Sequence, residues 1–451
     1  MAHVKDMTVG APLPLILNFS IPLILGNLLQ QTYSLIDAAI VGQFLGINAL
    51  ASVGASSSVT FLILGFCTGC CGGFGIPVAQ KFGARDYVTM RRLVAVSMKL
   101  SAGLSVVLAL LTSLLCASIL RWMQTPETIL EGAHTYLLII FLGIPCSFFY
   151  NLLSSIIRAL GDSKTPFLFL LFSTVLNVLL DLLCILVFGW GVAGAAIATV
   201  VSQGISVVLC YRYMYRKFEI LHTEPADRKF RWDLAKQLMM IGTPMGLQFS
   251  ITAIGSILLQ SANNALGTAC VAAYTAAVRI EMIFICMVES LGIAMATFCG
   301  QNYGAGKPDR IWQGVKSAGK LTFYYVIFVN VVLWTFSENF AALFVHSGEL
   351  EVIERTATYL HITACFFPLL GILCILRYSI QGAGYTQLAM FSGVSEMIAR
   401  TLVSMVAVPV WGFHAVCFGD GIAWVFADLF LIPAFIYVYR KLQQIVQGKR
   451  V

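Results

Sequence analysis

Carboxylates inside long apolar segments are the residues of this sequence best placed to do chemistry. Asp37 and Asp181 each lie in such a segment, and Asn177 precedes Asp181 by one helical turn, so these two side chains share one face of a helix. A charged carboxylate in an apolar layer costs several kcal/mol unless it is paired, hydrated or neutralised. Each of these acids therefore requires a ligand, a proton or a polar partner.

The depth of these acids indicates a shared site. Counting from the expected outer ends of their helices at ~1.5 Å per residue places Asp37 about 13 Å, and Asp181 and Thr199 about 10 Å, into the apolar layer. No basic residue of the N-terminal half is expected at that depth. Carboxylate, amide and hydroxyl oxygens suit a hard cation such as Na⁺, and the same carboxylates could instead take up protons. We predict a cation or proton site formed by Asp37, Asn177, Asp181 and Thr199; hydrogen bonding to Ser, Thr or backbone is the structural alternative.

Other polar or adaptable side chains extend this prediction to a possible substrate cavity. Methionine-rich apolar surfaces repack around ligands of different shape. For any one of these residues, ordinary packing is the alternative. The candidates are Gln30, Gln31, Tyr33 and Gln203 in the N-terminal half and Met245, Phe249, Glu281 and Met282 in the C-terminal half.

The C-terminal half has further embedded acids. Glu396 and Arg400 are one helical turn apart, which favours an internal ion pair over substrate contact. For Glu281 both roles stay open, Glu289 follows it by two turns, and the sequence offers no firm role for Asp428. The cysteines lie almost entirely in apolar segments as packed thiols, so no disulfide framework or metal site is expected from them.

The elements that position these residues are membrane helices. Of the 451 residues, 59% are hydrophobic and 11% charged, and the mean hydropathy is +0.86. Soluble domains carry roughly 25% charged residues, so this composition excludes a water-soluble fold. Apolar runs long enough to cross a ~30 Å hydrocarbon core recur along the chain. They predict an all-α integral membrane protein with about twelve spanning helices, near residues 15–41, 48–75, 92–120, 134–157, 166–188, 192–213, 237–262, 268–298, 316–337, 356–380, 386–409 and 414–438.

Basic residues set the orientation of these spans. Lys and Arg collect in alternate loops, whereas the loops between them hold mainly Glu. By the positive-inside rule the basic loops and both termini are cytoplasmic, as an even number of spans requires. The net charge of +7 therefore marks one side of a membrane rather than a nucleic-acid surface. The basic groups are Lys81, Arg85, Arg91, Arg92, Arg158, Lys164, the connector from Arg212 to Lys236, Lys307, Arg310, Lys316, Lys320, Arg377, Arg440, Lys441, Lys449 and Arg450.

The two halves of the chain repeat one another at an offset of about 222 residues. Pro22 aligns with Pro244 and Gly46 with Gly267. Six helices per half is an even number, so both halves enter the membrane in the same direction and form two pseudo-symmetric lobes about a substrate path. The predicted parts are an N-lobe at 1–220, a cytoplasmic connector at 221–236 and a C-lobe at 237–451.

Three motifs carry a family resemblance. The first helix contains Ile21-Pro22 and Asp37-Ala38-Ala39-Ile40-Val41-Gly42, and the next loop contains Gln80-Lys81-Phe82-Gly83-Ala84. Arg158-Ala159-Leu160-Gly161-Asp162-Ser163-Lys164-Thr165-Pro166 joins the fourth and fifth helices. These motifs resemble those of the multidrug and toxin extrusion (MATE) family, and the resemblance covers essentially the whole chain.

The resemblance implies a V-shaped, two-lobed antiporter that expels organic cations in exchange for Na⁺ or H⁺. It is nearest to the DinF-like branch, whose cation-binding positions fall on Asp37, Asn177, Asp181 and Thr199. Another branch has essential carboxylates in helices 7 and 10, where this chain offers Gln248 and His361 but no acid. This difference favours coupling in the N-lobe.

We therefore predict a secondary active antiporter of the cell (inner) membrane, not an enzyme. Its expected partners are organic cations and drugs, the lipid bilayer and a coupling ion, Na⁺ or H⁺, with no other cofactor, no nucleic acid and a monomeric state. The alternative is a flippase for a lipid-linked oligosaccharide, which would need a strongly basic cavity; Arg279 and Arg400 give this little support. The sequence contains no HExxH or GxSxG motif of an embedded enzyme.

Overall fold

The computed structural model describes residues 5–123, 125–222, 224–225, 227, 229–344 and 349–448. The predicted cytoplasmic charges Lys449 and Arg450 lie outside these described residues.

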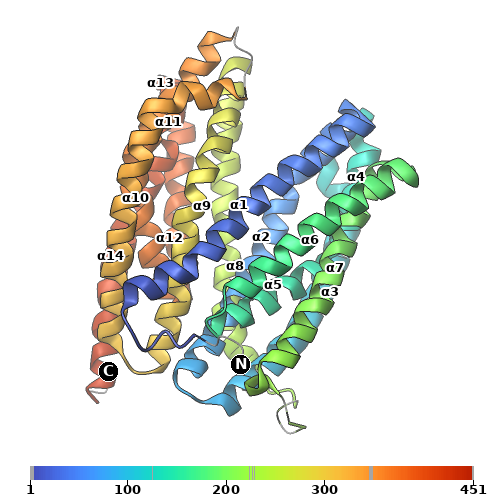
Figure 1. Cartoon of the computed structure of the whole chain (residues 1–451). Helices are drawn as coiled ribbons and strands as arrows, with labels where there is room; N and C mark the ends of the chain where they lie inside the picture. The colour runs from blue at the N-terminus through green and yellow to red at the C-terminus, as the bar shows by residue number, and fades with distance from the viewer. Residues whose placement is uncertain are drawn as a thin grey trace. The chain divides into compact units, whose positions relative to one another are not determined.

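Every regular element in these ranges is a helix, which confirms the all-α class (Figure 1). The N-terminal half contains α1 (Pro12–Leu45), α2 (Ile47–Gly83), α3 (Tyr87–Trp122), α4 (Glu127–Leu142), α5 (Ile144–Ala159), α6 (Lys164–Leu182), the π-helix η1 (Leu183–Val187), α7 (Gly191–Lys217) and the short 3₁₀ helix η2 (Glu219–Leu221). The C-terminal half contains α8 (Trp232–Asn264), α9 (Thr268–Gly304), α10 (Pro308–Ala342), α11 (Leu350–Gly382), α12 (Thr386–Leu402), the π-helix η3 (Val403–Ala407), α13 (Val408–Trp411) and α14 (Phe413–Val446).

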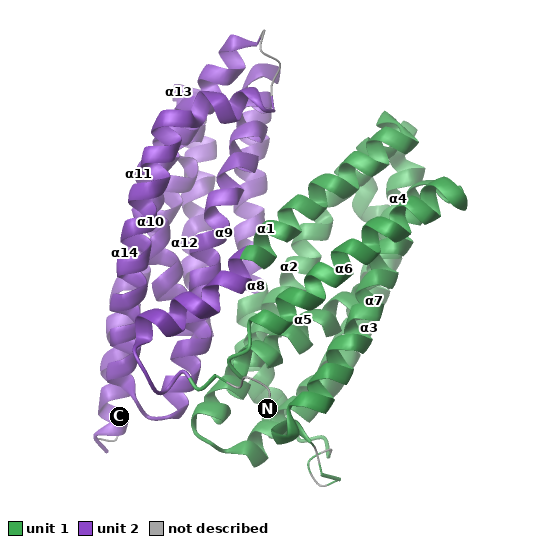
Figure 2. Ribbon diagram, viewed as in Figure 1, with its two compact units in different colours: residues 1–6, 25–246 green, residues 7–24, 247–451 purple. Residues whose placement is uncertain are grey.

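The helices form two compact units (Figure 2). Unit 1 comprises Leu25–Gly246 and the described residues before Met7, and unit 2 comprises Met7–Ile24 and Leu247–Val451. Large buried side chains such as Phe148 in unit 1 and Phe367 in unit 2 pack within the two separate cores. Both α1 and α8 contribute residues to both units. The domain limits taken from the sequence repeat stay a prediction.

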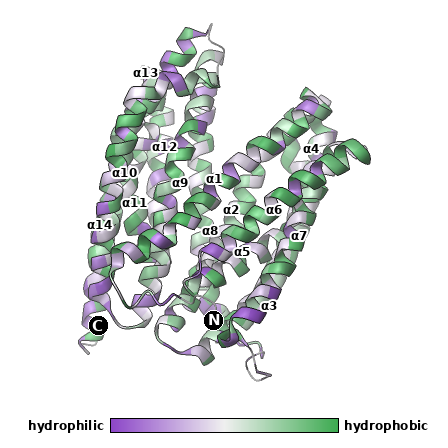
Figure 3. Cartoon of the chain, in the orientation of Figure 1, coloured by the Kyte–Doolittle hydropathy of each residue, from purple (hydrophilic) through white to green (hydrophobic). Residues whose placement is uncertain are grey.

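Most of the described helices are able to cross a membrane. Eleven are long and apolar enough, and α4 with α5, bent by 46° at their junction, make a twelfth if the pair is one span. Apolar residues cover much of the length of the long helices (Figure 3). The chain is a multi-pass membrane protein, as predicted.

Two local expectations are wrong. The segment predicted as one helix at 134–157 bends after Gly143, because Pro145 begins a new helix in a first turn where its missing N–H breaks no helical bond. Arg377, predicted to be one of the cytoplasmic basic groups at the end of its helix, instead lies inside α11, which continues to Gly382, and only 7% of the residue is exposed. A basic residue near a helix end does not mark a loop when its side chain pairs with an acid inside the bundle, as Arg377 does with Glu396.

The pseudo-symmetry of the two halves is visible in the backbone. Gly46 and Gly267, aligned in the repeat, have positive φ angles of 86° and 102° directly before α2 and α9. Only glycine adopts this conformation without strain. The corresponding helices α6 and α12 are each followed at once by a five-residue π-helix. The two halves therefore share local geometry as well as sequence.

Asp227 anchors the connector after α7 to α3. Its carboxylate accepts hydrogen bonds from Arg91 at 3.0 Å and Arg92 at 3.1 Å, and its side chain is 3% exposed. Burial alone would raise the pKa of Asp227, but the hydrogen bonds from the two arginines outweigh it and hold the pKa below its ordinary value. A lowered pKa contributes stability above the ordinary aspartate pKa and loses that contribution as the pH falls through the folded value.

We expect Asp227→Asn to lower the free energy of unfolding by about 1 kcal/mol at neutral pH, a modest effect because both arginines are partly exposed. The difference from the wild type should shrink as the pH falls below the ordinary aspartate pKa and disappear below the lowered pKa of Asp227. Thermal unfolding of both proteins in detergent, across an acid pH series, measures this. Asp233→Asn is the control, because both Asp233 and its partner Arg231 are well exposed. A difference in stability between Asp227→Asn and the wild type that grows in acid would contradict the assignment.

Candidate functional site

Asp37, Asn177, Asp181 and Thr199 lie together inside unit 1. Asp37 belongs to α1, Asn177 and Asp181 to α6, and Thr199 to α7. The first three are 8%, 2% and 0% exposed, and Thr199 is half-buried. The side chains of Asp37 and Asp181 are hydrogen-bonded to each other. The four predicted residues therefore form one cluster, which we call the acid cluster, and their role stays a prediction.

Asn177 connects the members of the acid cluster. In the amide orientation that satisfies both of its polar atoms, its nitrogen donates to Asp181 Oδ2 at 2.8 Å and to Tyr33 Oη at 3.2 Å. Its oxygen then accepts from Thr199 Oγ1 at 3.2 Å. Tyr33 Oη also lies 3.3 Å from Thr199 Oγ1. Tyr33, predicted only as a cavity residue, is thus part of the cluster, and Tyr136 of α4, which was not predicted, lies close enough to interact with both carboxyls.

Two carboxyl oxygens of the acid cluster lack partners. Asp37 Oδ1 and Asp181 Oδ1 are buried and accept no hydrogen bond. Leaving a buried acceptor unsatisfied costs about 1–3 kcal/mol. The bond between the two carboxyls also requires that one of them be protonated, because an ionised carboxylate has no hydrogen to donate. The cluster is therefore suited to take up a proton or a small cation.

The donor set fits a hard cation better than a transition metal. The described residues contain no group of three or more His, Cys, Asp or Glu side chains that could hold a metal ion. A cation at the acid cluster would thus need the amide oxygen of Asn177 and the hydroxyl of Thr199 besides the two carboxylates. Oxygen ligands of this mixture are typical of sites for Na⁺ and similar ions rather than zinc or copper.

Local helix geometry positions the acid cluster. Asn177 and Asp181 are one turn apart on α6, and the helix widens into η1 two residues after Asp181. The widened segment ends at Val187, where the Phe188 N–H donates to the Leu183 carbonyl at 3.1 Å. Single π-turns inside helices occur frequently at functional sites, because they rotate the residues that follow.

The remaining predicted cavity residues are dispersed. On α1, Gln30 is exposed and Gln31 half-buried, whereas Gln203 of α7 accepts a hydrogen bond from Ser147. A small pocket of unit 2 is lined by nine residues that include Leu17, Met287 and Tyr325, and by none of the predicted cavity residues. The predicted cavity residues belong to both units. Met245 is buried in unit 1, whereas Phe249, Glu281 and Met282 belong to unit 2. That they line one substrate cavity stays a prediction.

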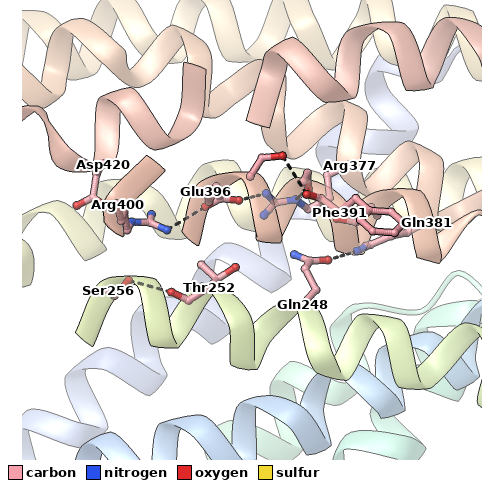
Figure 4. A network of polar contacts seen from close by, with 12 residues as sticks. Gln248, Thr252, Ser256, Arg377, Gln381, Phe391, Glu396, Arg400 and Asp420 are labelled. Atoms are coloured by element: carbon pink, nitrogen blue, oxygen red, sulfur yellow. Dashed lines mark hydrogen bonds and ion pairs between the residues drawn. The ribbon is translucent and has the colours of Figure 1, made fainter. Parts of the chain in front are cut away.

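Unit 2 contains a chain of buried ion pairs (Figure 4). The predicted pair of Glu396 and Arg400 is confirmed, with 3.3 Å between Glu396 Oε2 and Arg400 Nη1. Glu396 is also bound by Arg377 of α11, and Arg400 Nε lies 2.8 Å from Asp420 Oδ1 of α14. The sequence analysis assigned Arg377 to the cytoplasmic charges and did not consider Asp420, although a charge inside an apolar segment is a detectable signal for each. Asp428 is 4% exposed with no hydrogen-bond partner for either oxygen, and nothing in the described structure explains it.

The sequence is similar to those of known transporters along most of its length. The MatE family model matches residues 22–183 and 244–406. The chain is 30% identical over 433 residues to the probable multidrug resistance protein YpnP of Bacillus subtilis (strain 168), and the alignment covers 96% of each chain. It is 26% identical over 373 residues to a protein of Shewanella oneidensis named FAD transporter, covering 81% of each chain.

The fold is likewise similar to solved structures. One of these, described as the outward-facing conformation of a multidrug resistance MATE family transporter of the MOP superfamily, has a TM-score of 0.91 at 23% identity, covering 98% of this chain and 99% of the other. The two segments matched by the family model begin at residues 22 and 244, in agreement with the predicted offset of the repeat. Because the family model and a relative of 30% identity both span most of its sequence, the chain belongs to the MATE family of multidrug efflux transporters.

Proposed function

We propose that this chain is a secondary active antiporter that exports organic cations, including drugs, across the cell membrane in exchange for Na⁺ or H⁺. The observation that carries the proposal is the buried, hydrogen-bonded carboxyl pair of Asp37 and Asp181 in helices able to span the membrane. The relative named as a multidrug resistance protein supports the class of substrate. We further propose that both termini lie in the cytoplasm and that the chain acts as a monomer and not as an enzyme.

The acid pair provides a mechanism for exchange. A coupling ion that binds Asp37 and Asp181 removes the cost of holding two acids in an apolar layer. It also reduces their attraction for a cationic substrate, so ion loading and substrate binding oppose one another. An ion drives a conformational change only to the extent that it binds the two conformations with different affinity. The buried Oδ1 atoms of both acids, which have no hydrogen-bond partner in this conformation, support ion or proton uptake at the acid cluster.

The flippase alternative is less well supported. A pyrophosphate-linked substrate would require free basic groups in the transport path. The two buried arginines of unit 2, Arg377 and Arg400, are already bound by Glu396 and Asp420. The same argument applies to other anionic cargo, including a flavin dinucleotide. The described interior therefore favours cationic substrates.

Dye efflux in everted membrane vesicles tests the proposed function. We expect a cationic dye to accumulate in vesicles that contain the protein when either an imposed Na⁺ gradient or an imposed pH gradient is present, and the effective gradient identifies the coupling ion. An ionophore that collapses that gradient should stop accumulation. Vesicles without the protein are the control. Accumulation that persists when both gradients are absent would contradict antiport.

A further inference from the structure

Unit 2 contains a chain of buried and half-buried polar side chains that the proposed function does not use. Glu281 of α9 meets Tyr359 of α11, and Tyr359 meets Asp420 of α14. Asp420 is in turn bound by Arg400 of α12. Glu281 is 3% exposed and Tyr359 is fully buried. From Arg400 the chain continues through Glu396 and Arg377, as Figure 4 shows.

The hydroxyl of Tyr359 has too few hydrogens for its contacts. Tyr359 Oη lies 3.0 Å from Glu281 Oε2 and 3.0 Å from Asp420 Oδ2. A phenol carries a single hydrogen, so it can donate to only one of these carboxyls. If both carboxyls were ionised, the second contact would bring two acceptors together in a buried site. One of the two carboxyls must therefore supply a hydrogen of its own.

The surroundings identify Glu281 as the protonated acid. Both oxygens of Asp420 have donors, because Oδ1 accepts from Arg400 Nε at 2.8 Å and Oδ2 faces Tyr359. A guanidinium bonded to a carboxylate holds it in the ionised form. Glu281, by contrast, forms no described salt bridge, and its Oε1 is buried without a hydrogen-bond partner. The energetic cost of ionisation therefore falls on Glu281.

The charges of the chain lead to the same assignment. Arg377 and Arg400 carry two positive charges, and Glu396 and Asp420 carry two negative charges that neutralise them. An ionised Glu281 would add a buried negative charge that forms no described salt bridge. An uncompensated buried charge is strongly unfavourable. A neutral Glu281 avoids this unpaired charge and supplies the hydrogen that the Tyr359 contacts require.

We propose that Glu281 is a proton-binding site of unit 2, at which it donates a hydrogen bond to Tyr359 while Tyr359 donates its own to ionised Asp420. The ligand is a single proton, exchanged with water as Glu281 passes between carboxylic acid and carboxylate. The site uses neither Asp37 nor Asp181, so it stands whether or not the proposed coupling in unit 1 is correct.

The groups around Glu281 come from four helices. Tyr359 of α11 and Asp420 of α14 face it, and Arg400 of α12 is the nearby cation. Tyr274, on the same helix as Glu281, packs edge-on against the Tyr359 ring with centroids 5.5 Å apart. Loss of the proton would place a negative charge among these side chains and leave Asp420 without the Tyr359 hydrogen. The protonation state of Glu281 thus acts on contacts that join α9, α11, α12 and α14.

Infrared spectroscopy of the full chain in lipid tests the proposal, because a protonated carboxyl has a carbonyl stretching band that a carboxylate lacks. We expect such a band at neutral pH in protein labelled with ¹³C-glutamate, shifted by the label and therefore not from an aspartate. The band should remain in the Asp37→Asn/Asp181→Asn variant and in Glu289→Gln, which removes the other embedded glutamate of α9. In the Glu289→Gln background it should be lost when Glu281→Gln is added. Tyr359→Phe should move it to higher frequency, because the acceptor of the carboxyl hydrogen is removed.

The control is Glu351→Gln, which removes a glutamate whose side chain is 65% exposed and should leave the band unchanged. Absence of a glutamate band at neutral pH would overturn the proposal, and so would a band of equal size in Glu289→Gln and in the Glu281→Gln/Glu289→Gln double variant. If Glu281→Gln does not fold, the labelled wild type still decides the first point. Transport measurements do not enter either result, so failure of the proposed antiport and failure of this site are separable.

Discussion

Replacing either Asp37 or Asp181 by asparagine should reduce dye accumulation to the level of vesicles that lack the protein. Asparagine has nearly the shape of aspartate, but it can neither bind a proton near neutral pH nor carry the charge that attracts a cation. The two acids are hydrogen-bonded to each other and buried, so loss of one changes the ion affinity of both. Efflux in everted vesicles, normalised to the amount of inserted protein, measures the effect.

Asp86→Asn is the matched control for these variants. Asp86 lies in unit 1 outside the apolar spans and caps α3 by accepting a hydrogen bond from the Thr89 N–H at 3.1 Å. Asparagine caps helices about as well as aspartate, so transport should be retained. Efflux at the wild-type rate by either Asp37→Asn or Asp181→Asn, in well-inserted protein, would show that the acid cluster does not couple transport.

Glu396→Gln should be the most destabilising conservative substitution in unit 2. Glu396 is 3% exposed on its side chain and neutralises both Arg377 and Arg400. Glutamine keeps the volume but removes the charge, and it leaves Arg377 without a described carboxylate partner. Breaking a buried ion pair on one side costs about 3–5 kcal/mol, a large part of the ~5–15 kcal/mol by which proteins are stable. We expect a much lower unfolding temperature or little folded protein.

Glu351→Gln provides a control of the same chemistry. Glu351 precedes Arg355 by four residues, as Glu396 precedes Arg400, but its side chain is 65% exposed. An exposed pair contributes about 0–1 kcal/mol. Unfolding can be followed in detergent with a dye that reacts with thiols, because most of the cysteines are buried. Equal unfolding temperatures for the two variants would mean that the buried chain contributes no more than a surface pair.

Depth along a helix is the property of the site that could be predicted from sequence. Each residue advances a helix by a fixed rise, so counting from the helix ends is enough to place Asp37, Asp181 and Thr199 at a common level. The spacing of Asn177 and Asp181 indicates their shared face. The structure brings these residues into one cluster. The helical class could be predicted from hydropathy, and the repeat from aligning the two halves of the sequence. Both predictions need only the position of each residue along the chain.

Rotation about the helix axis could not be predicted. Whether Arg377 faces lipid or Glu396, and which cation meets Asp420, depends on how neighbouring helices pack, and hydropathy contains no such information. Tyr359 is an extreme case, because an aromatic residue in an apolar helix gives no sign that two carboxyls share its hydroxyl. The bend between α4 and α5 was missed although Gly143 and Pro145 mark it, since the apolar run continues through both residues.

The membership of α1 and α8 in both units bears on how the repeat arose. The division between the units falls after Ile24 in α1 and after Gly246 in α8, in each case two residues beyond the aligned prolines Pro22 and Pro244. Each half therefore gives the beginning of its first helix to the other unit and receives the equivalent segment in return. Such reciprocal exchange of identical elements is the defining feature of a domain-swapped dimer. Because each unit includes a segment from the other half of the sequence, a chain cut at the connector would leave both units incomplete.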